Sequence, residues 1–461
     1  MKIVLCNPEV RLKYSHSRKG MYPPLGLLSI ATMIEQAHIG CVDIQIIDGD
    51  VESIDPVVFQ DAELIGFHAN SFNYENCLSL AQKAKEYGAS IILGGPHADV
   101  LWENIMEKRS FIDFIVSGEG ELTMVMLVDL ILKNRVDLIE LEKIPNLVFR
   151  RADGKAKKAA LIHVNSPEEM ITPSRKFIDV DKYIANYRKI YSKESIRFER
   201  PLSIYSSKGC SWRDKTGGCI FCARLERGVR FRNIPEIWNE ISDLKEKYKT
   251  DYIWDISDDN LNSTEWFKQF VDQRPESLSD VSFLIYSRVN RITDDIIPYL
   301  KKLNVYEVYL GIESGDDTML KNTMKGASAK LALNAARRLK DAGIYYFPSF
   351  VLGLPGESEK SLENSLKFAE DLARIGSIFR MSATILMPIP GSQVFSMMKD
   401  NPSIDRELFS NDIVSIKDLE KQWIEHYTDT DYATLEKYQQ KINEIIQKES
   451  GTESFGKKID K

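Results

Sequence analysis

Residues 208–226 read KGCSWRDKTGGCIFCARLE and hold three of the chain's six cysteines, Cys210, Cys219 and Cys222. The cysteine spacing is C-x8-C-x2-C, and no fourth cysteine lies nearby. The stretch follows PLSIYSS, which is predicted to be the first strand of an alternating strand–helix series. In barrels of parallel strands, the loops that follow the strands carry the chemistry. We therefore expect the three thiols at the mouth of such a barrel.

The chain after this stretch alternates strand and helix patterns as far as LMPIPGS. The series makes about six strand–helix units, which predicts a partial TIM-type (β/α)6 barrel over residues 198–395. Polar and ionisable residues gather at the carboxyl ends of its strands, where a barrel of this kind binds its ligands.

Another alternating series precedes the cysteine stretch. Short apolar strands and amphipathic helices over residues 1–145 predict a doubly wound, Rossmann-like sheet, which binds ligands at its carboxyl strand ends. Residues 146–197 are predicted to be a linker that contains a polar turn or hairpin tip, RRADGKAKKAA. Residues 396–461 are predicted to form a helical C-terminal region with a disordered tail, GTESFGKKIDK.

The composition is that of a soluble protein with more than one domain. Of the 461 residues, 43% are apolar and 28% are charged. The formal net charge of -7 argues against a general nucleic-acid binder, so no nucleic-acid partner is expected. MKIVLCNPEV reads as a strand rather than a signal peptide, and no apolar run is long enough to span a membrane. We therefore expect a cytoplasmic protein, with Cys6, Cys41 and Cys77 as buried free thiols.

Three closely spaced thiols admit more than one chemistry. Zinc normally takes four nitrogen or sulfur ligands in a closed site, so a zinc site here would have to recruit a distant ligand. A disulfide is disfavoured in a reducing compartment. An iron–sulfur cubane held by three thiolates leaves one iron free to bind a substrate or a cofactor.

The motifs taken together resemble the radical S-adenosylmethionine (SAM) superfamily. In that family three cysteines hold a [4Fe-4S] cluster and SAM chelates the fourth iron. Most members use C-x3-C-x2-C; this chain keeps the last spacing and the aromatic residue before the final cysteine, Phe221, but widens the first gap to eight residues. The resemblance continues, in the family's order, through five further strings: DISDDN, YSRVN, GIESGDDTMLKNTMKG, VLGLPGES and LMPIPGS.

This resemblance assigns roles to several residues of the barrel. Glu313 and Arg288 would hold polar parts of SAM, Asp258 or Asp259 would lie near its methionyl end, and the backbone around Gly353 would face the adenosine. Each assignment has a structural alternative. Glu313 could be a surface carboxylate, Arg288 could form a structural ion pair, and the two aspartates could cap the following helix.

The first 145 residues resemble the cobalamin-binding domain that is fused to many radical SAM enzymes. The resemblance rests on YPPLGLLSIATMIE, GGPHA and GEGE. The D-x-H-x-x-G motif that supplies a histidine to cobalt is absent, so His97 is expected to be a rim or loop contact. A degenerate domain that binds no cofactor, or only dimerises, remains the alternative. The expected cobalamin contacts are Ser71, Gly94, Gly95, Pro96, His97, Gly118 and Glu119.

The resemblance implies an enzyme that cleaves SAM reductively at a [4Fe-4S] cluster. The first reading is a class B-like, cobalamin-dependent methyltransferase that acts on an unactivated carbon. The second is cyclisation, oxidation or rearrangement without methyl transfer, with a ribosomal peptide among the candidate substrates. The third is a non-catalytic cobalamin or iron–sulfur sensor. An enzyme of this kind would take electrons from a flavodoxin or ferredoxin and would bind a small-molecule or peptide substrate.

The widened gap between Cys210 and Cys219 is the chain's main departure from the family. Its residues Trp212, Arg213 and Lys215 would either face the mouth of the active site or only fold the loop.

Overall fold

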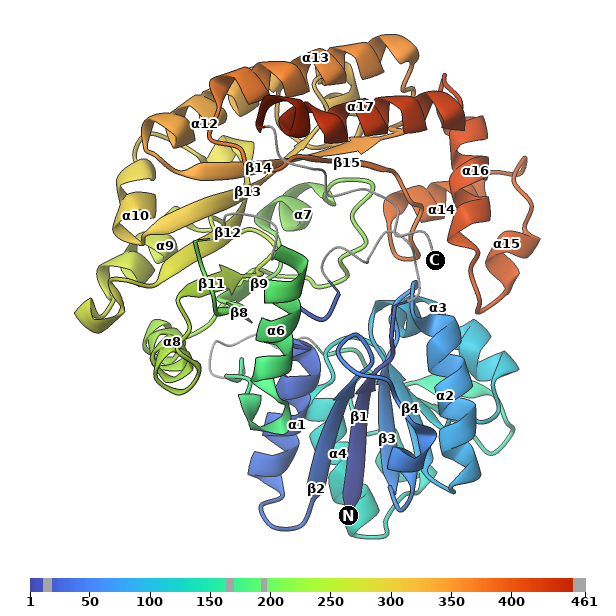
Figure 1. Cartoon of the computed structure of the whole chain (residues 1–461). Coiled ribbons are helices and arrows are strands. Elements are labelled where there is room, and N and C mark those ends of the chain that lie inside the picture. Colours follow the sequence, from blue (N-terminus) through green and yellow to red (C-terminus); the bar gives the residue numbers. More distant parts are fainter. Residues whose placement is uncertain (11–18, 163–169, 192–196, 451–461) are drawn as a thin grey trace.

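The protein is described by a computed structural model that covers residues 1–10, 19–162, 170–191 and 197–450. These residues form an N-terminal α/β body, a larger α/β body above it and a set of C-terminal helices (Figure 1). The predicted disordered tail, residues 451–461, lies outside the described residues. None of the helices in the described ranges has the length and apolar character needed to cross a membrane.

The N-terminal body is built on a seven-stranded sheet with the order β2-β1-β3-β4-β5-β6-β7. Strands β1 to β5 are parallel, and β6 and β7 pair antiparallel at one edge. The strands are β1 (Lys2–Asn7), β2 (Asp43–Asp48), β3 (Leu64–His68), β4 (Ser90–Gly94), β5 (Phe114–Val116), β6 (Leu147–Arg150) and β7 (Ala156–Lys158).

Helices cover both faces of this sheet, as the doubly wound prediction requires. One face packs on α1 (Leu25–Ala37) and α4 (Glu121–Leu132), and the other on α2 (Tyr74–Glu86) and α3 (Pro96–Lys108) (Figure 1). The central strands are buried on both sides, which explains why their sequences are apolar throughout rather than alternating. Two short helical segments, η2 (Pro56–Phe59) and α5 (Leu138–Leu141), complete the body.

The segment predicted as a linker, residues 146–197, differs from that expectation in its first part. Strands β6 and β7 form a hairpin, around the predicted polar tip, that extends the N-terminal sheet. Of the remainder, the described residues 170–191 contain η4 (Arg175–Phe177) and α6 (Val180–Tyr191).

The larger body is a half-barrel of six parallel strands with the order β15-β14-β13-β12-β11-β8. It confirms the predicted partial barrel. The strands are β8 (Pro201–Ile204), β11 (Tyr252–Asp255), β12 (Ser282–Arg288), β13 (Val305–Glu313), β14 (Tyr345–Leu352) and β15 (Ser382–Ile385).

The helices between these strands pack on the outside of the half-barrel (Figure 1). Their starts follow local sequence signals: Asn233 caps α8, which has a proline in its first turn, and Ser358 forms a capping box with Ser361 at α13. The helices are α8 (Ile234–Tyr248), α9 (Thr264–Asp272), η5 (Glu276–Leu278), η6 (Val289–Arg291), α10 (Ile297–Lys302), α11 (Asp317–Asn322), α12 (Ala329–Asp341) and α13 (Glu359–Ile375).

The C-terminal helices close the open edge of the half-barrel. They are α14 (Gln393–Asp400), α15 (Glu407–Ser410), α16 (Ile416–Tyr427) and α17 (Tyr432–Ser450). Helix α17 lies along α13 and β15, where the side-chain oxygen of Asn443 accepts a hydrogen bond from the Ala383 N–H at 2.7 Å. Side chains of α17 thus satisfy backbone groups that an uncovered edge strand would leave unpaired.

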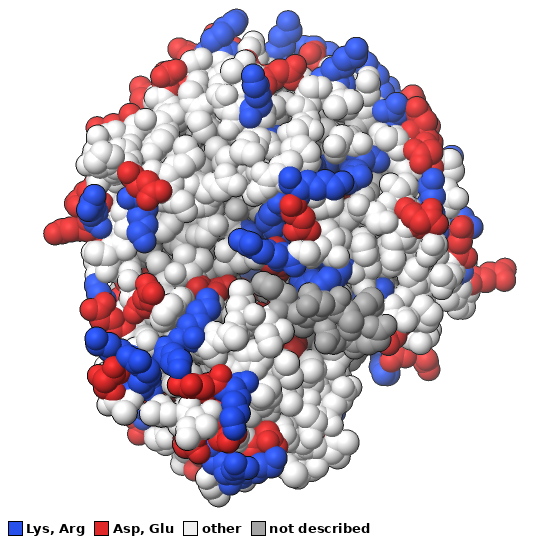
Figure 2. All heavy atoms as spheres, turned by 180° about the vertical axis from the view of Figure 1, so that it is seen from behind, with Lys and Arg blue, Asp and Glu red and all other residues white. Residues whose placement is uncertain are grey.

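The surface is mixed in charge, and one predicted burial is wrong. Figure 2 shows lysine and arginine side chains interspersed with aspartate and glutamate on the face opposite to that of Figure 1.

Cys6 and Cys77 are buried, as expected, but Cys41 is exposed because it lies in the turn after α1.

Candidate functional site

The three clustered cysteines lie between β9 (Ser207–Lys208) and β10 (Arg230–Phe231), directly after the first strand of the half-barrel. All three are partly buried. The Cys222 N–H donates to the Cys219 carbonyl at 3.0 Å, which folds C-x2-C into a tight turn. Among the described residues, no three His, Cys, Asp or Glu side chains converge closely enough to hold a single metal ion. A cubane needs a different arrangement, in which each thiolate binds its own iron.

The widened gap does not form an open loop. Residues Ser211–Thr216 form a short helix, α7, that ends at Gly217 and Gly218, both of which have positive φ. The Trp212 indole N–H donates to the Met324 carbonyl at 2.7 Å, so this side chain anchors the segment. Arg213 is also engaged in contacts within the fold, whereas Lys215 is exposed.

Glu313 ends strand β13 in a left-handed conformation, with φ of 67°, where the register to β14 shifts. Its carboxylate forms an ion pair with the Lys325 ammonium at 2.6 Å. The Arg288 guanidinium donates to the Lys325 carbonyl and lies 4.2 Å from the centre of the Trp212 ring. Burial raises the pKa of the nearby Cys219 thiol, and the positive charge of Lys325 acts against that rise. These side chains and Cys219 therefore share one environment.

The two aspartates of DISDDN play different parts. Asp259 is fully buried, and this burial raises its pKa to about 6. One of its carboxylate oxygens accepts from the Leu261 N–H at 3.1 Å. Neither aspartate caps the following helix, because Ser263 is the N-cap of α9, so the capping alternative is wrong. Asp258 instead pairs with the guanidinium groups of Arg213 and Arg224.

Gly353 lies in a turn that is held by its own hydrogen bonds. Its N–H donates to a Glu357 carboxylate oxygen at 2.6 Å, and its carbonyl accepts from the Trp423 indole at 2.7 Å. The open side of Gly353 faces Leu435 and Ile385, so the turn packs against the C-terminal region.

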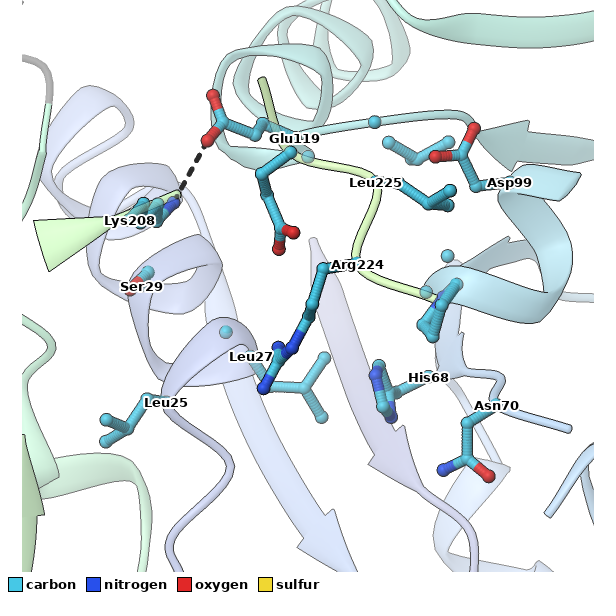
Figure 3. A pocket seen from close by; sticks show the side chains of 18 of the residues that line it. Leu25, Leu27, Ser29, His68, Asn70, Asp99, Glu119, Lys208, Arg224 and Leu225 are labelled. Carbon is cyan, nitrogen blue, oxygen red and sulfur yellow. Dashed lines mark hydrogen bonds and ion pairs between the residues drawn. The ribbon is translucent and has the colours of Figure 1, made fainter. Parts of the chain in front are cut away.

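A cavity of about 1260 Å³ lies between the two α/β bodies. One wall is the carboxyl edge of the N-terminal sheet, and the opposite wall is the segment around Cys222 together with Asp258. Figure 3 shows Arg224 extending from the segment after Cys222 toward Leu27 and His68 of the N-terminal body. The predicted residues that line this cavity are Ser71, Gly94, Gly95, Pro96, Gly118, Glu119, Phe221, Cys222 and Asp258.

Comparison with protein families assigns both walls of this cavity. Residues 13–128 match the B12 binding domain, and residues 204–369 match the radical SAM superfamily. The chain is a radical SAM enzyme with a B12-binding domain. These domains imply a [4Fe-4S] cluster, SAM and cobalamin as cofactors.

Three relatives are similar over much of the chain. The uncharacterized methyltransferase PH0819 of Pyrococcus horikoshii is 28% identical over 86% of this chain and 82% of its own. The cytidylyl-2-hydroxyethylphosphonate methyltransferase of Streptomyces wedmorensis is 23% identical over 85% and 80%. The anaerobic magnesium-protoporphyrin IX monomethyl ester cyclase of Rubrivivax gelatinosus is 25% identical over 63% of this chain and about half, 51%, of its own length.

A solved structure shares the arrangement of the two domains. The radical SAM methyltransferase TsrM from Kitasatospora setae superposes with a TM-score of 0.67, at 15% identity, over 86% of this chain and 76% of its own. The likeness shows that the B12-binding and radical SAM domains of this chain adopt a known fold.

The radical SAM domain has polar atoms that fit an additional polar ligand. Within the described part of the chain, one carboxylate oxygen of Asp259 and the Nε of Arg288 are buried without a hydrogen-bond partner. Because buried polar groups are normally paired, these atoms suit a ligand that carries both donors and acceptors. The amino-acid end and the ribose of SAM have this character.

The B12-binding domain leaves room for a large ligand at its sheet edge. Gly95 has a φ of 99°, and a Cβ there would lie 2.6 Å from the Ala69 carbonyl, so only glycine fits. The cavity volume exceeds the range of about 300–1,000 Å³ that is usual for small-molecule pockets. A cavity of this size suits a corrin ring together with a substrate.

His97 does not lie at the rim of the cavity, in contrast to the expectation from GGPHA. The residue is 1% exposed, stacks on Tyr74 and does not line the cavity. Its Nδ1 is 3.1 Å from the Ser71 hydroxyl and its Nε2 is 2.8 Å from the Asp412 carbonyl. Burial lowers its pKa to about 4, so the ring is neutral. His97 therefore supports the cavity wall through Ser71.

Charged pairs join the two domains beside the cavity. Glu119 pairs with Arg230 at 2.7 Å. It also pairs with Lys208 at 3.4 Å (Figure 3). These bases come from β9 and β10, on either side of the cysteine segment. Glu119 is an expected cobalamin contact, whereas Lys208, Arg230 and Lys325 are site residues that the sequence motifs alone did not identify. Lys325 lies within the GIESGDDTMLKNTMKG string, so its position in that motif could have indicated that it belongs to the site.

Proposed function

We propose that this protein is a cobalamin-dependent methyltransferase that acts on an unactivated carbon. The observation that carries the proposal is the shared cavity, which is lined by Gly94 and Gly95 of the B12-binding domain and by Cys222 and Asp258 of the radical SAM domain. A substrate in this space would contact both cofactors. Two of the three relatives named above are methyltransferases, which supports the same reading.

The cluster would be held by residues of this chain. Cys210, Cys219 and Cys222 would hold the cluster, with residues 198–395 as the radical SAM domain. When bound, the cluster and cobalamin supply the electron that cleaves SAM and the methyl group that is transferred. An electron donor of the flavodoxin or ferredoxin type would reduce the cluster.

The SAM site would be built from buried side chains. Arg288, Asp259 and Glu313 would bind the polar parts of SAM, with Lys325 fixing the orientation of the Glu313 carboxylate. The remaining predicted contact, the backbone near Gly353, would have to act through the turn that Glu357 holds in place. Burial of these groups would exclude water from the bound cofactor.

The cobalamin side would be formed by the sheet edge of residues 1–145. Ser71, Gly118 and Glu119 line that side of the cavity, with Ser71 held by His97. Cobalt would carry no histidine from a D-x-H-x-x-G motif, since the chain lacks one.

The test is anaerobic reconstitution with iron, sulfide and hydroxocobalamin, followed by incubation with SAM and a chemical reductant. We expect both 5′-deoxyadenosine and S-adenosylhomocysteine as products, and Cys219→Ala should yield neither because the cluster is lost. Cys41→Ala is the matched control, since this thiol is exposed and lies outside the site.

The products also separate the alternatives. 5′-Deoxyadenosine without S-adenosylhomocysteine would contradict methyl transfer and favour cyclisation, oxidation or rearrangement, as the cyclase relative suggests. Neither product from protein that has bound cobalamin would contradict an enzymatic role and favour a sensor. A complete cubane in Cys219→Ala would overturn the ligand assignment.

A further inference from the structure

The widened cysteine gap places an arginine beside a cluster cysteine. Arg213 lies on α7, and its Nη1 is 3.9 Å from the Cys222 Sγ, within hydrogen-bonding distance for sulfur. The family spacing of three residues would leave no room for this helix. The insertion therefore brings a permanently charged N–H donor to one of the three thiolates.

Arg213 is held in this position by contacts along its whole length. Its Nε donates to the Glu226 carbonyl at 3.0 Å, and its Nη2 is 3.4 Å from an Asp258 carboxylate oxygen. The side chain is only 13% exposed. A Cβ at Gly218 would come within 3.2 Å of the Arg213 stem, so the turn after α7 packs directly on it.

The helix that carries Arg213 is itself anchored to the barrel. The Trp212 indole N–H donates a hydrogen bond to the Met324 carbonyl, and Arg291 donates one to the Ser211 hydroxyl at 3.0 Å. At the other end, Gln393 donates to the Gly217 carbonyl at 3.0 Å. The insertion is thus a fixed element whose geometry persists around Cys222.

We propose that the insertion raises the reduction potential of the cluster by donating an N–H···S hydrogen bond from Arg213 to the Cys222 thiolate. The inference rests on the proposed function, because it requires the cubane. Reduction adds one electron from the donor to the cluster, without breaking a bond, and so increases its negative charge. A cationic donor on a thiolate stabilises the reduced form more than the oxidised form.

The test is the midpoint potential of the reconstituted cluster, measured by EPR during dithionite titration without SAM or cobalamin. Arg213→Gln removes the positive charge together with the guanidinium. Arg213→Lys keeps a positive charge but loses the planar set of N–H donors of the guanidinium. Lys215→Gln is the matched control, because it removes an exposed charge from the same helix. Iron and sulfide are counted in every variant.

We expect a more negative midpoint in Arg213→Gln. At the potential that half-reduces the wild-type cluster, the ratio of reduced to oxidised cluster should fall about tenfold, which corresponds to about 59 mV for one electron. Arg213→Lys should shift in the same direction by less, and Lys215→Gln should match the wild type.

An unchanged midpoint in Arg213→Gln with a full cluster would overturn the proposal, as would an equal shift in Lys215→Gln. If Arg213→Gln fails to hold the cluster, Arg213→Lys decides by the same criterion, and loss of the cluster there too would overturn a tuning role. Failure of the wild type to form any cubane would instead contradict the proposed function.

Discussion

At the scale of single residues, the buried ion pair of Glu313 and Lys325 is the main addition to the predicted site. The two side chains are 9% and 8% exposed, and a Cβ at Gly311 would come within 3 Å of both charged groups. Gly311 thus provides the space in which the pair forms. Because both charged groups are largely removed from water, each is stabilised in its charged form mainly by the other.

Removing one partner should therefore be costly. We expect Lys325→Met to lower the free energy of unfolding by about 3 kcal/mol, because it leaves the Glu313 carboxylate buried and unpaired. Urea denaturation of the cofactor-free protein measures this change. The double variant Glu313→Gln/Lys325→Met should recover most of the loss, since neither charge remains. A single variant as stable as the wild type would show that water reaches the pair.

At the scale of elements, α7 is the helix that the insertion forms. It packs on Gly326 through the ring of Trp212. The Trp212 ring lies where a side chain on Gly326 would have to be, because a Cβ there would come 2.2 Å from the ring. Gly326 also has a positive φ of 63°. The insertion and the end of the GIESGDDTMLKNTMKG string are therefore packed against each other, although more than 100 residues separate Trp212 from Gly326.

We expect Gly326→Ala to displace α7 by forcing the Trp212 ring out of its seat. Trypsin should then cleave after Lys215 at least about tenfold faster, because cleavage requires local opening of the helix. Gly343→Ala is the matched control: it has a similar positive φ of 72° but open space at its Cβ. Equal cleavage rates in the two variants would contradict the packing role of Gly326.

At the scale of the whole molecule, the C-terminal region is fastened to the B12-binding domain by Asp412. This carboxylate is 1% exposed and accepts from Arg109 at 2.7 Å and from the Tyr74 hydroxyl at 2.7 Å. The Asp412 carbonyl is also 2.8 Å from His97. Asp412, in the segment that precedes α16, thus supports the cavity wall through its contact with His97, which in turn contacts Ser71.

We expect Asp412→Ala to lower the free energy of unfolding by about 2 kcal/mol, and Tyr74→Phe by about 1 kcal/mol, since it removes one bond. Burial alone would raise the pKa of Asp412, but hydrogen bonds from Arg109 and Tyr74 outweigh it and hold the pKa below its ordinary value. The stabilisation is therefore present above the ordinary carboxyl pKa and is lost as the pH falls through the lowered value.

Thermal unfolding of both variants at neutral and acidic pH checks this prediction. The difference between the wild type and Asp412→Ala should shrink as the pH falls. A difference that is independent of pH would show that the carboxylate charge does not hold the two regions together.

Much of the fold could be predicted because its signals are local. Apolar runs of four to eight residues mark strands, and capping residues such as Asn233 and Ser358 mark helix starts, whatever the rest of the chain does. The edge hairpin of β6 and β7 was not predicted to join the N-terminal sheet. Its strands are short and only partly apolar, so their pairing depends on the neighbouring β5 rather than on their own pattern.

The amino-acid sequence by itself determined the two α/β series and the three-cysteine motif, because side-chain periodicity follows from backbone geometry within a few residues. Only the tertiary structure decided which side chains share a cavity or a charge. Arg213 meets Cys222 and Asp258, Trp212 meets Gly326, and His97 meets Asp412 through contacts that depend on how helices and strands pack. Such contacts leave no periodic trace in the chain, because each joins segments whose separation in sequence has no relation to their distance in space.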